Sequence, residues 1–328
     1  MSKIVVIGSN SFSGAMFSSY ALARGEKVIG TSRSVQPSDA FLPYKWQEHQ
    51  QFEFQKLDLN SDLKALMELI NDERPAYIVN FAAQSMVAES WANPGDWFST
   101  NVVATIKFHD ELRKCNFLMR YVHVSTPEVY GSCSGFVDES YPFNPSTPYA
   151  VSRAAADMSL RTFHAAYDFP VVTTRASNVY GPGQQLYRII PRTILFILLG
   201  RKLQLHGGGA STRSFIHMAD VSDATWKLMT SGINGSTYHI STNEVVSIRA
   251  LVETICKKLE VDFDEHVEVV GERLGKDSAY HLDSKKVRSE LGWADQVTLD
   301  QGLDHCIAWV KNHLDVLRFE PSSYQHKA

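Results

Sequence analysis

Four side chains near the middle of the chain bring together a hydroxyl, a carboxylate, a phenol and a guanidinium. Thr126 and Glu128 lie in the stretch VSTPEVYG, and Tyr149 and Arg153 lie in PYAVSR. On a helix, residues four apart share one face, so Arg153 would lie beside Tyr149. A fixed cation stabilises a phenolate and lowers the pKa of the phenol. Such a phenol can take a proton from an alcohol near neutral pH. The alternative is that Tyr149 is a surface residue and Arg153 a solvated one, with no role in chemistry.

The elements around these side chains would hold them in a ligand-binding crevice. The apolar run Met119–Val124 predicts a buried strand, and Thr126 and Glu128 follow its carboxyl end. In open α/β sheets, ligands bind beyond those ends. A turn-rich loop comes next, and Ser146 is the predicted N-cap of a helix over residues 149–167. The four candidates therefore converge on one edge of a sheet.

A glycine-rich turn near the amino terminus predicts a site for a dinucleotide. Lys3–Gly8 reads as a buried strand, and a helical pattern runs on to Arg24. Gly8 permits a tight turn, Gly14 permits close helix–strand packing, and the helix N-terminus suits a pyrophosphate. Ser11 stands where such motifs usually have their middle glycine. The predicted cofactor contacts here are Gly8, Asn10, Ser11, Phe12, Ser13 and Gly14.

The end of the second predicted strand, Lys27–Arg33, bears on the choice between NAD and NADP. A carboxylate at this place would bind the ribose 2′-hydroxyl of NAD, but the sequence has Ser32, Arg33 and Ser34. A guanidinium with flanking hydroxyls suits a 2′-phosphate. The sequence therefore favours NADP over NAD, with a solvated Arg33 as the alternative.

Further ligand contacts are predicted where later strands end. Asp58 and Leu59 can border an adenine, although Asp58 can equally cap a helix that begins near Asn60. Small residues after the fourth strand would let the backbone approach the cofactor, and two loop arginines would bind phosphate. The remaining cofactor contacts are Phe81, Ala82, Ala83, Tyr149 and Arg153, and the substrate contacts are Gln84, Ser85, Thr126, Glu128, Asn178, Arg213 and Arg273.

Composition is that of an ordinary globular protein. The 328 residues are 44% hydrophobic and 21% charged, with a net charge of −4, so nucleic acid and anionic membrane are not expected as partners. The four cysteines show no metal-binding or redox spacing, and no metal site is predicted. A strand that begins at Lys3 leaves no room for a signal peptide, and a cytoplasmic protein with reduced thiols is expected. We expect His109 on the polar face of a helix over 100–115, and a frayed tail after about Arg318.

Strands and helices alternate from residue 3 to about 176, which predicts an α/β fold with a doubly wound parallel sheet. The carboxyl third is less regular and predicts a smaller α/β substrate-binding domain. We assign residues 1–176 with about 213–242 to a Rossmann NAD(P)-binding domain. Residues of about 177–212 and 243–328 form the predicted substrate domain.

Taken together, the motifs resemble the extended short-chain dehydrogenase/reductase family, and within it the nucleotide-sugar 4,6-dehydratases. The likeness covers almost the whole chain and rests on the amino-terminal glycine turn, NFAAQS, TNVVAT, STPEVYG, PYAVSR, SNVYGPG, TRSFIHMADV and ERLGKD…LGW. It implies a nicotinamide cofactor, an NDP-hexose substrate and a homodimer built through the helices over 100–115 and 149–167. The segment FAAQSMVAESW most resembles the corresponding segment of dehydratases that act on NDP-N-acetylglucosamine in legionaminic-type pathways.

The resemblance also implies roles for the candidate residues. Tyr149, as phenolate, would take the proton of the 4-hydroxyl while hydride leaves carbon 4, and Thr126 would hydrogen-bond the same oxygen. Glu128 would then remove the proton from carbon 5, the 6-hydroxyl would leave as water, and hydride would return to carbon 6. The product would be a 4-keto-6-deoxy sugar.

Two departures from the family pattern leave alternatives open. Pro127 replaces an Asp that assists departure of the 6-hydroxyl, so Glu128 is hypothesised to carry its proton there. Arg153 replaces a Lys and keeps the positive charge, although its planar fork is not equivalent to an ammonium. An NDP-sugar 4-epimerase or reductase, a 5,6-dehydratase and a non-catalytic NADP-binding sensor are the alternatives.

Overall fold

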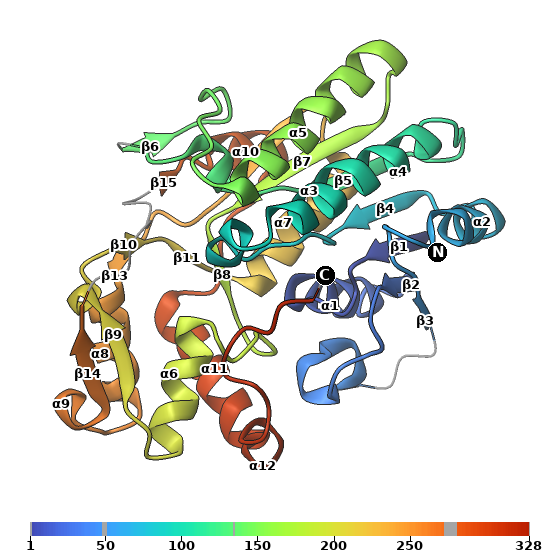
Figure 1. Cartoon of the computed structure of the whole chain (residues 1–328). Coiled ribbons are helices and arrows are strands. Elements are labelled where there is room, and N and C mark those ends of the chain that lie inside the picture. The colour runs from blue at the N-terminus through green and yellow to red at the C-terminus, as the bar shows by residue number, and fades with distance from the viewer. Residues whose placement is uncertain (1, 48–50, 134, 272–280, 328) are drawn as a thin grey trace.

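The computed structural model describes residues 2–47, 51–133, 135–271 and 281–327. Within these residues, no helix is both long enough and apolar enough to cross a membrane. Figure 1 shows a central sheet with helices on both faces and a second group of helices and short strands beside it.

The central sheet has seven strands in the order β12-β7-β5-β4-β1-β2-β3, and all neighbouring pairs are parallel. The β-branched and aliphatic runs of β1, β2 and β4 fit strands that are buried on both faces, whereas β3 at the edge is more exposed. The doubly wound α/β fold predicted from the sequence is confirmed. The strands are β1 (Lys3–Ile7), β2 (Lys27–Ser32), β3 (Phe52–Lys56), β4 (Tyr77–Asn80), β5 (Arg120–Val124), β7 (Val171–Ala176) and β12 (Thr237–Ile240).

Helices cover both faces of this sheet, each through an apolar core. One core joins the strands to α2, α4 and α5, and the other joins them to α1 and α7. A π-helical segment, Ser99–Ala104, connects α3 to α4, so the predicted helix over 100–115 is not one regular α-helix. The helices are α1 (Phe12–Leu22), α2 (Leu63–Glu73), α3 (Pro94–Phe98), α4 (Thr105–Leu112), α5 (Pro148–Tyr167) and α7 (Met218–Ser231).

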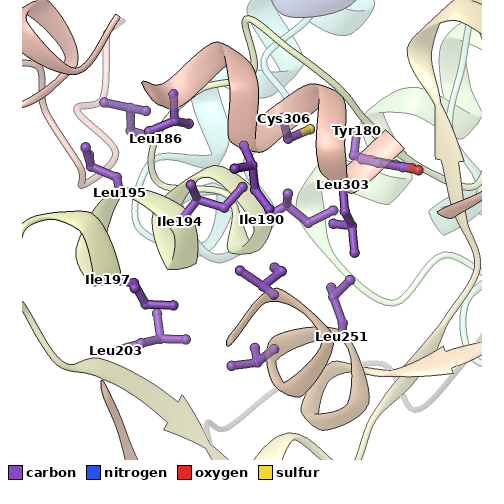
Figure 2. Packing of buried hydrophobic residues seen from close by; sticks show 14 of the residues in the cluster. Tyr180, Leu186, Ile190, Ile194, Leu195, Ile197, Leu203, Leu251, Leu303 and Cys306 are labelled. Carbon is purple, nitrogen blue, oxygen red and sulfur yellow. The ribbon is translucent and has the colours of Figure 1, made fainter. Parts of the chain in front are cut away.

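A second apolar core lies in the carboxyl-terminal lobe. Figure 2 shows Ile190 and Ile194 of α6 facing Leu251 of α8 and Leu303 of α11. We propose the domain division given above, which this separate core supports. The elements of the lobe are α6 (Ile189–Leu198), β9 (Leu203–His206), β10 (Thr212–Arg213), β13 (Val246–Ser247), α8 (Ile248–Lys258), α9 (Phe263–His266), β14 (Val267–Val270), α11 (Leu299–Asn312) and α12 (Leu314–Leu317).

Short elements join the two parts. Single 3-10 turns occur at Asp39–Phe41, Pro43–Lys45, Ala88–Trp91, Pro127–Tyr130 and Gly207–Gly209. The connecting strands and helix are β6 (Phe136–Val137), β8 (Asn178–Tyr180), β11 (Phe215–His217), β15 (His281–Leu282) and α10 (Lys285–Leu291). The described residues after α12 pack against side chains beyond the carboxyl ends of the central strands. They are therefore not frayed as the sequence suggested.

Candidate active site

Thr126 and Glu128 lie where β5 leaves the central sheet. The chain enters the 3-10 turn Pro127–Tyr130, and the Thr126 side chain caps it by accepting a hydrogen bond from the Glu128 N–H at 3.4 Å. Pro127 fits the first position of this turn, where no N–H is needed. Thr126 is 5% exposed, whereas Glu128 is only partly buried. The Glu128 carboxylate is therefore more accessible than the Thr126 hydroxyl, and both lie beyond the carboxyl end of β5.

Tyr149 and Arg153 lie in the first two turns of α5. The N-cap of this helix is Thr147, not Ser146 as predicted, and its side chain accepts from the Ala150 N–H at 3.1 Å. The Tyr149 N–H donates to Ser90 Oγ at 3.2 Å, which fixes the helix start against the segment after β4. Tyr149 and Arg153 are 7% and 2% exposed. The four candidates therefore do meet, on two adjoining elements.

The charge environment of Tyr149 differs from the sequence-based expectation. The pKa of the Tyr149 phenol is raised to about 12, chiefly by burial and also by the Glu128 carboxylate. Arg153, a hydrogen bond with Thr126 and the Arg188 side chain act in the opposite direction. The prediction of a net lowered pKa is wrong because a single guanidinium does not offset burial. In this structure the phenol is protonated at neutral pH.

The turn after β1 has no room for a Cβ atom at either of its two glycines. Gly8 has φ +83°, and a Cβ there would meet the Ala82 backbone nitrogen at 2.8 Å. A Cβ on Gly14 would meet the Gly8 carbonyl oxygen at 2.2 Å. Ser11, at the middle glycine position, caps α1 by accepting from the Gly14 N–H and also donates to the Gly8 carbonyl. This closely packed strand–turn–helix fits the phosphates of a dinucleotide.

Gly8 allows a matched test of this turn. We expect Gly8→Ala to weaken dinucleotide binding at least tenfold and to lower stability by roughly 1–3 kcal/mol, because it adds a backbone clash to an unfavourable φ. Gly25→Ala is the control, since Gly25 has φ +80° but no atom within 4 Å of its Cβ position. Equal binding defects in the two variants, measured by fluorescence titration with NADH and NADPH, would contradict a cofactor role for the turn.

The other predicted cofactor residues of the turn have mixed surroundings. The Asn10 N–H donates to Ser32 Oγ at 2.9 Å, and the Asn10 side-chain amide donates to the carbonyls of Ser34 and Val35. These bonds hold the end of β2 against the glycine turn. Phe12 is buried in a core with α7, and Ser13 is partly exposed on α1. Arg33 donates to the main-chain carbonyl of Lys327 at 3.0 Å.

The residues predicted after β3 and β4 divide into structural and cleft-facing groups. Asp58 accepts from the Asn60 N–H in a turn and does not cap a helix near Asn60, since α2 begins at Leu63. Leu59 is buried in the core of the sheet. Phe81 packs its ring on Phe17, with 5.7 Å between centroids. Ala82 and Ala83 continue the backbone after β4, and the Ala82 backbone lies beside Gly8.

The predicted substrate residues come from several segments. Gln84 is 3% exposed and donates from its side chain to the Lys327 carbonyl at 2.7 Å, while Ser85 is exposed. Asn178 begins β8, and its N–H donates to the Ser214 carbonyl. Arg213 lies in β10, and its guanidinium donates to the Thr212 carbonyl. Arg273 lies outside the described residues.

Sequence reasoning missed several residues at this site. Asn101 holds the Gln84 backbone in both directions, accepting from its N–H and donating to its carbonyl, both at 2.9 Å. Arg188, beside α6, is near enough to Tyr149 to lower its pKa. His109 was expected on a polar helix face but is fully buried, with Nε2 3.0 Å from the Tyr121 hydroxyl. The one sequence signal for Asn101 was the motif TNVVAT, which contains it.

The fold and the site together define a class. A parallel doubly wound sheet, a tight glycine turn at its first strand, and a Thr after β5 beside a Tyr at the start of α5 are features of an extended short-chain dehydrogenase/reductase. The comparisons with known proteins narrow this class to one family.

The family described as GDP-mannose 4,6 dehydratase matches residues 5–306. A dTDP-glucose 4,6-dehydratase of Xanthomonas campestris pv. campestris is 30% identical over 327 residues, covering 94% of this chain and 93% of that protein. The crystal structure of DesIV, a dTDP-glucose 4,6-dehydratase of Streptomyces venezuelae with NAD and TYD bound, superposes with a TM-score of 0.88 at 31% identity, covering 95% and 98% of the chains. The chain therefore belongs to the GDP-mannose 4,6-dehydratase family of nucleotide-sugar 4,6-dehydratases, which are hydro-lyases.

Proposed function

We propose that the protein converts an NDP-hexose into its 4-keto-6-deoxy derivative with a nicotinamide dinucleotide held at the glycine turn. The observation that carries this proposal is the convergence of Thr126, Glu128 and Tyr149, where a carboxylate stands beside an oxidation tyrosine. A plain dehydrogenase or epimerase has no use for a base at this place. The family and the tight turn at Gly8 support the same reading.

In the proposed reaction, Tyr149 accepts the proton of the sugar 4-hydroxyl, and Thr126 hydrogen-bonds the same oxygen. A nicotinamide dinucleotide held at the glycine turn would supply the hydride chemistry that links carbon 4 and carbon 6. Glu128 removes the proton of carbon 5, which the new 4-ketone has made acidic. Glu128 then gives this proton to the departing 6-hydroxyl, because Pro127 has no acidic group. Carbon 5 then takes a proton from solvent and Tyr149 releases the proton of the 4-hydroxyl, so one water leaves and no net oxidation occurs.

The protonation state of Tyr149 follows from its surroundings. The phenol must lose its proton before it can act as a base, and the structure gives it a pKa of about 12. The positive charge of an oxidised nicotinamide ring beside the phenol would favour the phenolate. We therefore place Tyr149 deprotonation in the ternary complex and not in the free protein.

For the substrate we propose dTDP-glucose as the first candidate. The curated relatives that match over nearly the whole chain act, by their names, on dTDP-glucose. The N-acetylglucosamine nucleotide suggested by the sequence segment FAAQSMVAESW is the second candidate. Arg213, Arg273 and Asn178 are proposed to bind the nucleotide end, and Gln84 and Ser85 the sugar end.

For the cofactor we propose NADP in preference to NAD. Ser32, Arg33 and Ser34 stand at the end of β2, without a carboxylate that would bind a ribose 2′-hydroxyl. DesIV was solved with NAD, which keeps NAD as the competitor in this proposal. Titration of both reduced dinucleotides decides it: NADPH should bind at least tenfold more tightly, and Arg33→Asp should reverse the order.

A homodimer is the proposed assembly. The outward face of α5 exposes Val151 and Met158 at 39% and 51%, and neighbouring Val103 is 51% exposed. Such an apolar stripe on adjacent helices suits pairing with a second copy. Light scattering on the intact chain should give the mass of two chains.

The deciding experiment is a panel of dTDP-glucose, GDP-mannose, and UDP- and GDP-N-acetylglucosamine, incubated in ordinary and heavy water and followed by mass spectrometry. Loss of one water from a single sugar nucleotide, with solvent deuterium at carbon 5, is the expected result. Isomerisation at carbon 4 without mass loss would replace the proposal with a 4-epimerase. Bound cofactor with no change in any sugar would favour the sensor.

A further inference from the structure

Arg153 is held from behind by one side chain of the sheet. Its Nη2 lies 3.2 Å from His123 Nε2 and donates to the Val124 carbonyl. Its Nη1 has no hydrogen-bond partner among the described residues. One amino group of the fork is therefore fixed while the other remains available. Both side chains are almost fully buried, at 2% and 0% exposure.

A buried carboxylate lies beside His123, but it cannot accept a hydrogen bond from Nε2 while that nitrogen accepts from Arg153. His123 Nε2 lies 3.4 Å from Asp157 Oδ1, and Asp157 Oδ2 binds Arg175 Nη2 at 2.7 Å and Ser125 Oγ at 2.7 Å. Burial lowers the pKa of His123, and the charges of Arg153 and Arg175 also lower it, against Asp157. The ring is therefore neutral. Its Nε2 can accept from Arg153 only when the ring proton is on Nδ1.

We propose that His123 is a positioning residue for Arg153. By accepting from Nη2, it orients the guanidinium so that its charge acts on the Tyr149 phenol. This inference rests on the proposed function. The charged groups that face Tyr149 are Glu128, from the turn after β5, and Arg153 and Arg188. Of these three groups, Arg153 is the one whose side chain contacts His123.

The test compares His123→Phe, which removes the acceptor, with His123→Gln, which restores an acceptor near the Nε2 position. His109→Phe is the matched control, because His109 is equally buried, its ring lies 5.8 Å from that of His123, and its Nε2 contacts Tyr121. We expect His123→Phe to move the acid limb of the kcat/KM profile upward by about one pH unit, since loss of a tenfold charge effect equals one pKa unit. His123→Gln should largely restore the limb, and His109→Phe should leave it unmoved.

Thermal midpoints of all variants separate positioning from stability. A His123→Phe profile that matches that of His109→Phe would overturn the inference. Absence of dehydration by the unaltered protein would overturn the proposed function instead, so the two failures are distinguishable.

An independent observation concerns the segment after α12. The Lys327 carbonyl accepts from Gln84 Nε2 and from Arg33 Nη2. His326 pairs with Asp96 at 2.7 Å and stacks on Trp97, with 5.1 Å between centroids and 11° between planes. In Figure 1 this segment rises from α12 and ends close to α1. It therefore connects the carboxyl-terminal lobe with the edge of the sheet.

The sheet order shows what this segment crosses. Arg33 follows β2 and Gln84 follows β4, and β1 lies between these two strands. Neighbouring strands are about 4.8 Å apart, so a single carbonyl that bonds both side chains lies over the end of β1. That is where the Gly8–Gly14 turn would receive a pyrophosphate. The segment therefore engages Arg33, which is proposed above to bind the cofactor.

We infer that residues 324–327 act as an internal competitor that must leave before the cofactor binds. This inference also depends on the proposed cofactor. A chain that ends at Ser323 should bind NADPH about tenfold more tightly, because a competitor lowers apparent affinity by the fraction of open sites. His326→Ala should tighten NADPH binding by a smaller factor. Lys327→Ala should leave NADPH binding unchanged, since only the main-chain carbonyl of Lys327 accepts the two hydrogen bonds.

Hydrogen exchange supplies a second readout on the full chain. Exchange in residues 321–327 should rise when NADPH is added. Weaker or unchanged binding by the shortened chain, or protection of this segment by NADPH, would overturn the competition. No NADPH binding by either chain would count against the proposed function.

Discussion

Glu128→Gln is expected to separate the two halves of the reaction. Turnover to the 4-keto-6-deoxy sugar should fall by about 10²–10⁴, the usual contribution of a general acid–base group. Oxidation at carbon 4 should persist, because Tyr149 and Thr126 are untouched. On mixing with substrate, the variant should therefore accumulate reduced cofactor, seen by absorbance at about 340 nm, and release no water.

A second consequence concerns pH. Glu128 raises the pKa of Tyr149, so its removal should lower that pKa. The acid limb of cofactor reduction in Glu128→Gln should accordingly move to lower pH. Tyr149→Phe is the companion variant and should form no reduced cofactor at any pH. Full activity of Glu128→Gln would instead point to an epimerase or reductase, which needs no base at carbon 5.

Asp157→Asn is expected to cost about 3–5 kcal/mol of unfolding free energy, because it leaves the buried Arg175 without its counter-ion. The two side chains are 2% and 3% exposed, and their charged atoms are 2.7 Å apart. Burial alone would raise the pKa of Asp157, but the Arg175 guanidinium holds it well below its ordinary value. The stabilisation is therefore complete above the unfolded pKa near about 4 and is lost as pH falls further.

Urea unfolding at several pH values tests this expectation. The difference between Asp157→Asn and the unaltered protein should be largest near neutral pH and should shrink below about pH 4. Glu253→Gln is the control, since the Arg249–Glu253 pair is 46% and 47% exposed and should change stability by less than about 1 kcal/mol. A loss no larger than that of the control would show that the buried pair contributes little.

The central sheet could be predicted because each strand is a local signal. The run of β1 is apolar on both faces, and this alone indicates a buried parallel strand. The glycine turn is also local, since Gly8 and Gly14 are separated by one short loop. The meeting of Thr126 with Tyr149 follows from the same reasoning, because both lie at the carboxyl end of the sheet.

Long-range and irregular features were beyond such signals. His109 was assigned to a polar face on the assumption of regular α-helical periodicity. The π segment Ser99–Ala104 adds a residue to a turn and rotates the helix face that follows. The Lys327 carbonyl meets Gln84 from 243 residues away, and a main-chain oxygen carries no sequence signal. Burial of Tyr149, which decides its pKa, likewise depends on packing between distant segments.

The second core has a consequence for synthesis on the ribosome. Its three main helices, α6, α8 and α11, are spread from Ile189 to Asn312. Leu303 and Cys306 of α11 complete the apolar contacts with Ile190 and Ile194 of α6 (Figure 2). At about 5–20 residues per second, α6 waits at least several seconds for this partner. During that interval its apolar face is a natural client for chaperones, long after the strands of the sheet up to β7 have emerged.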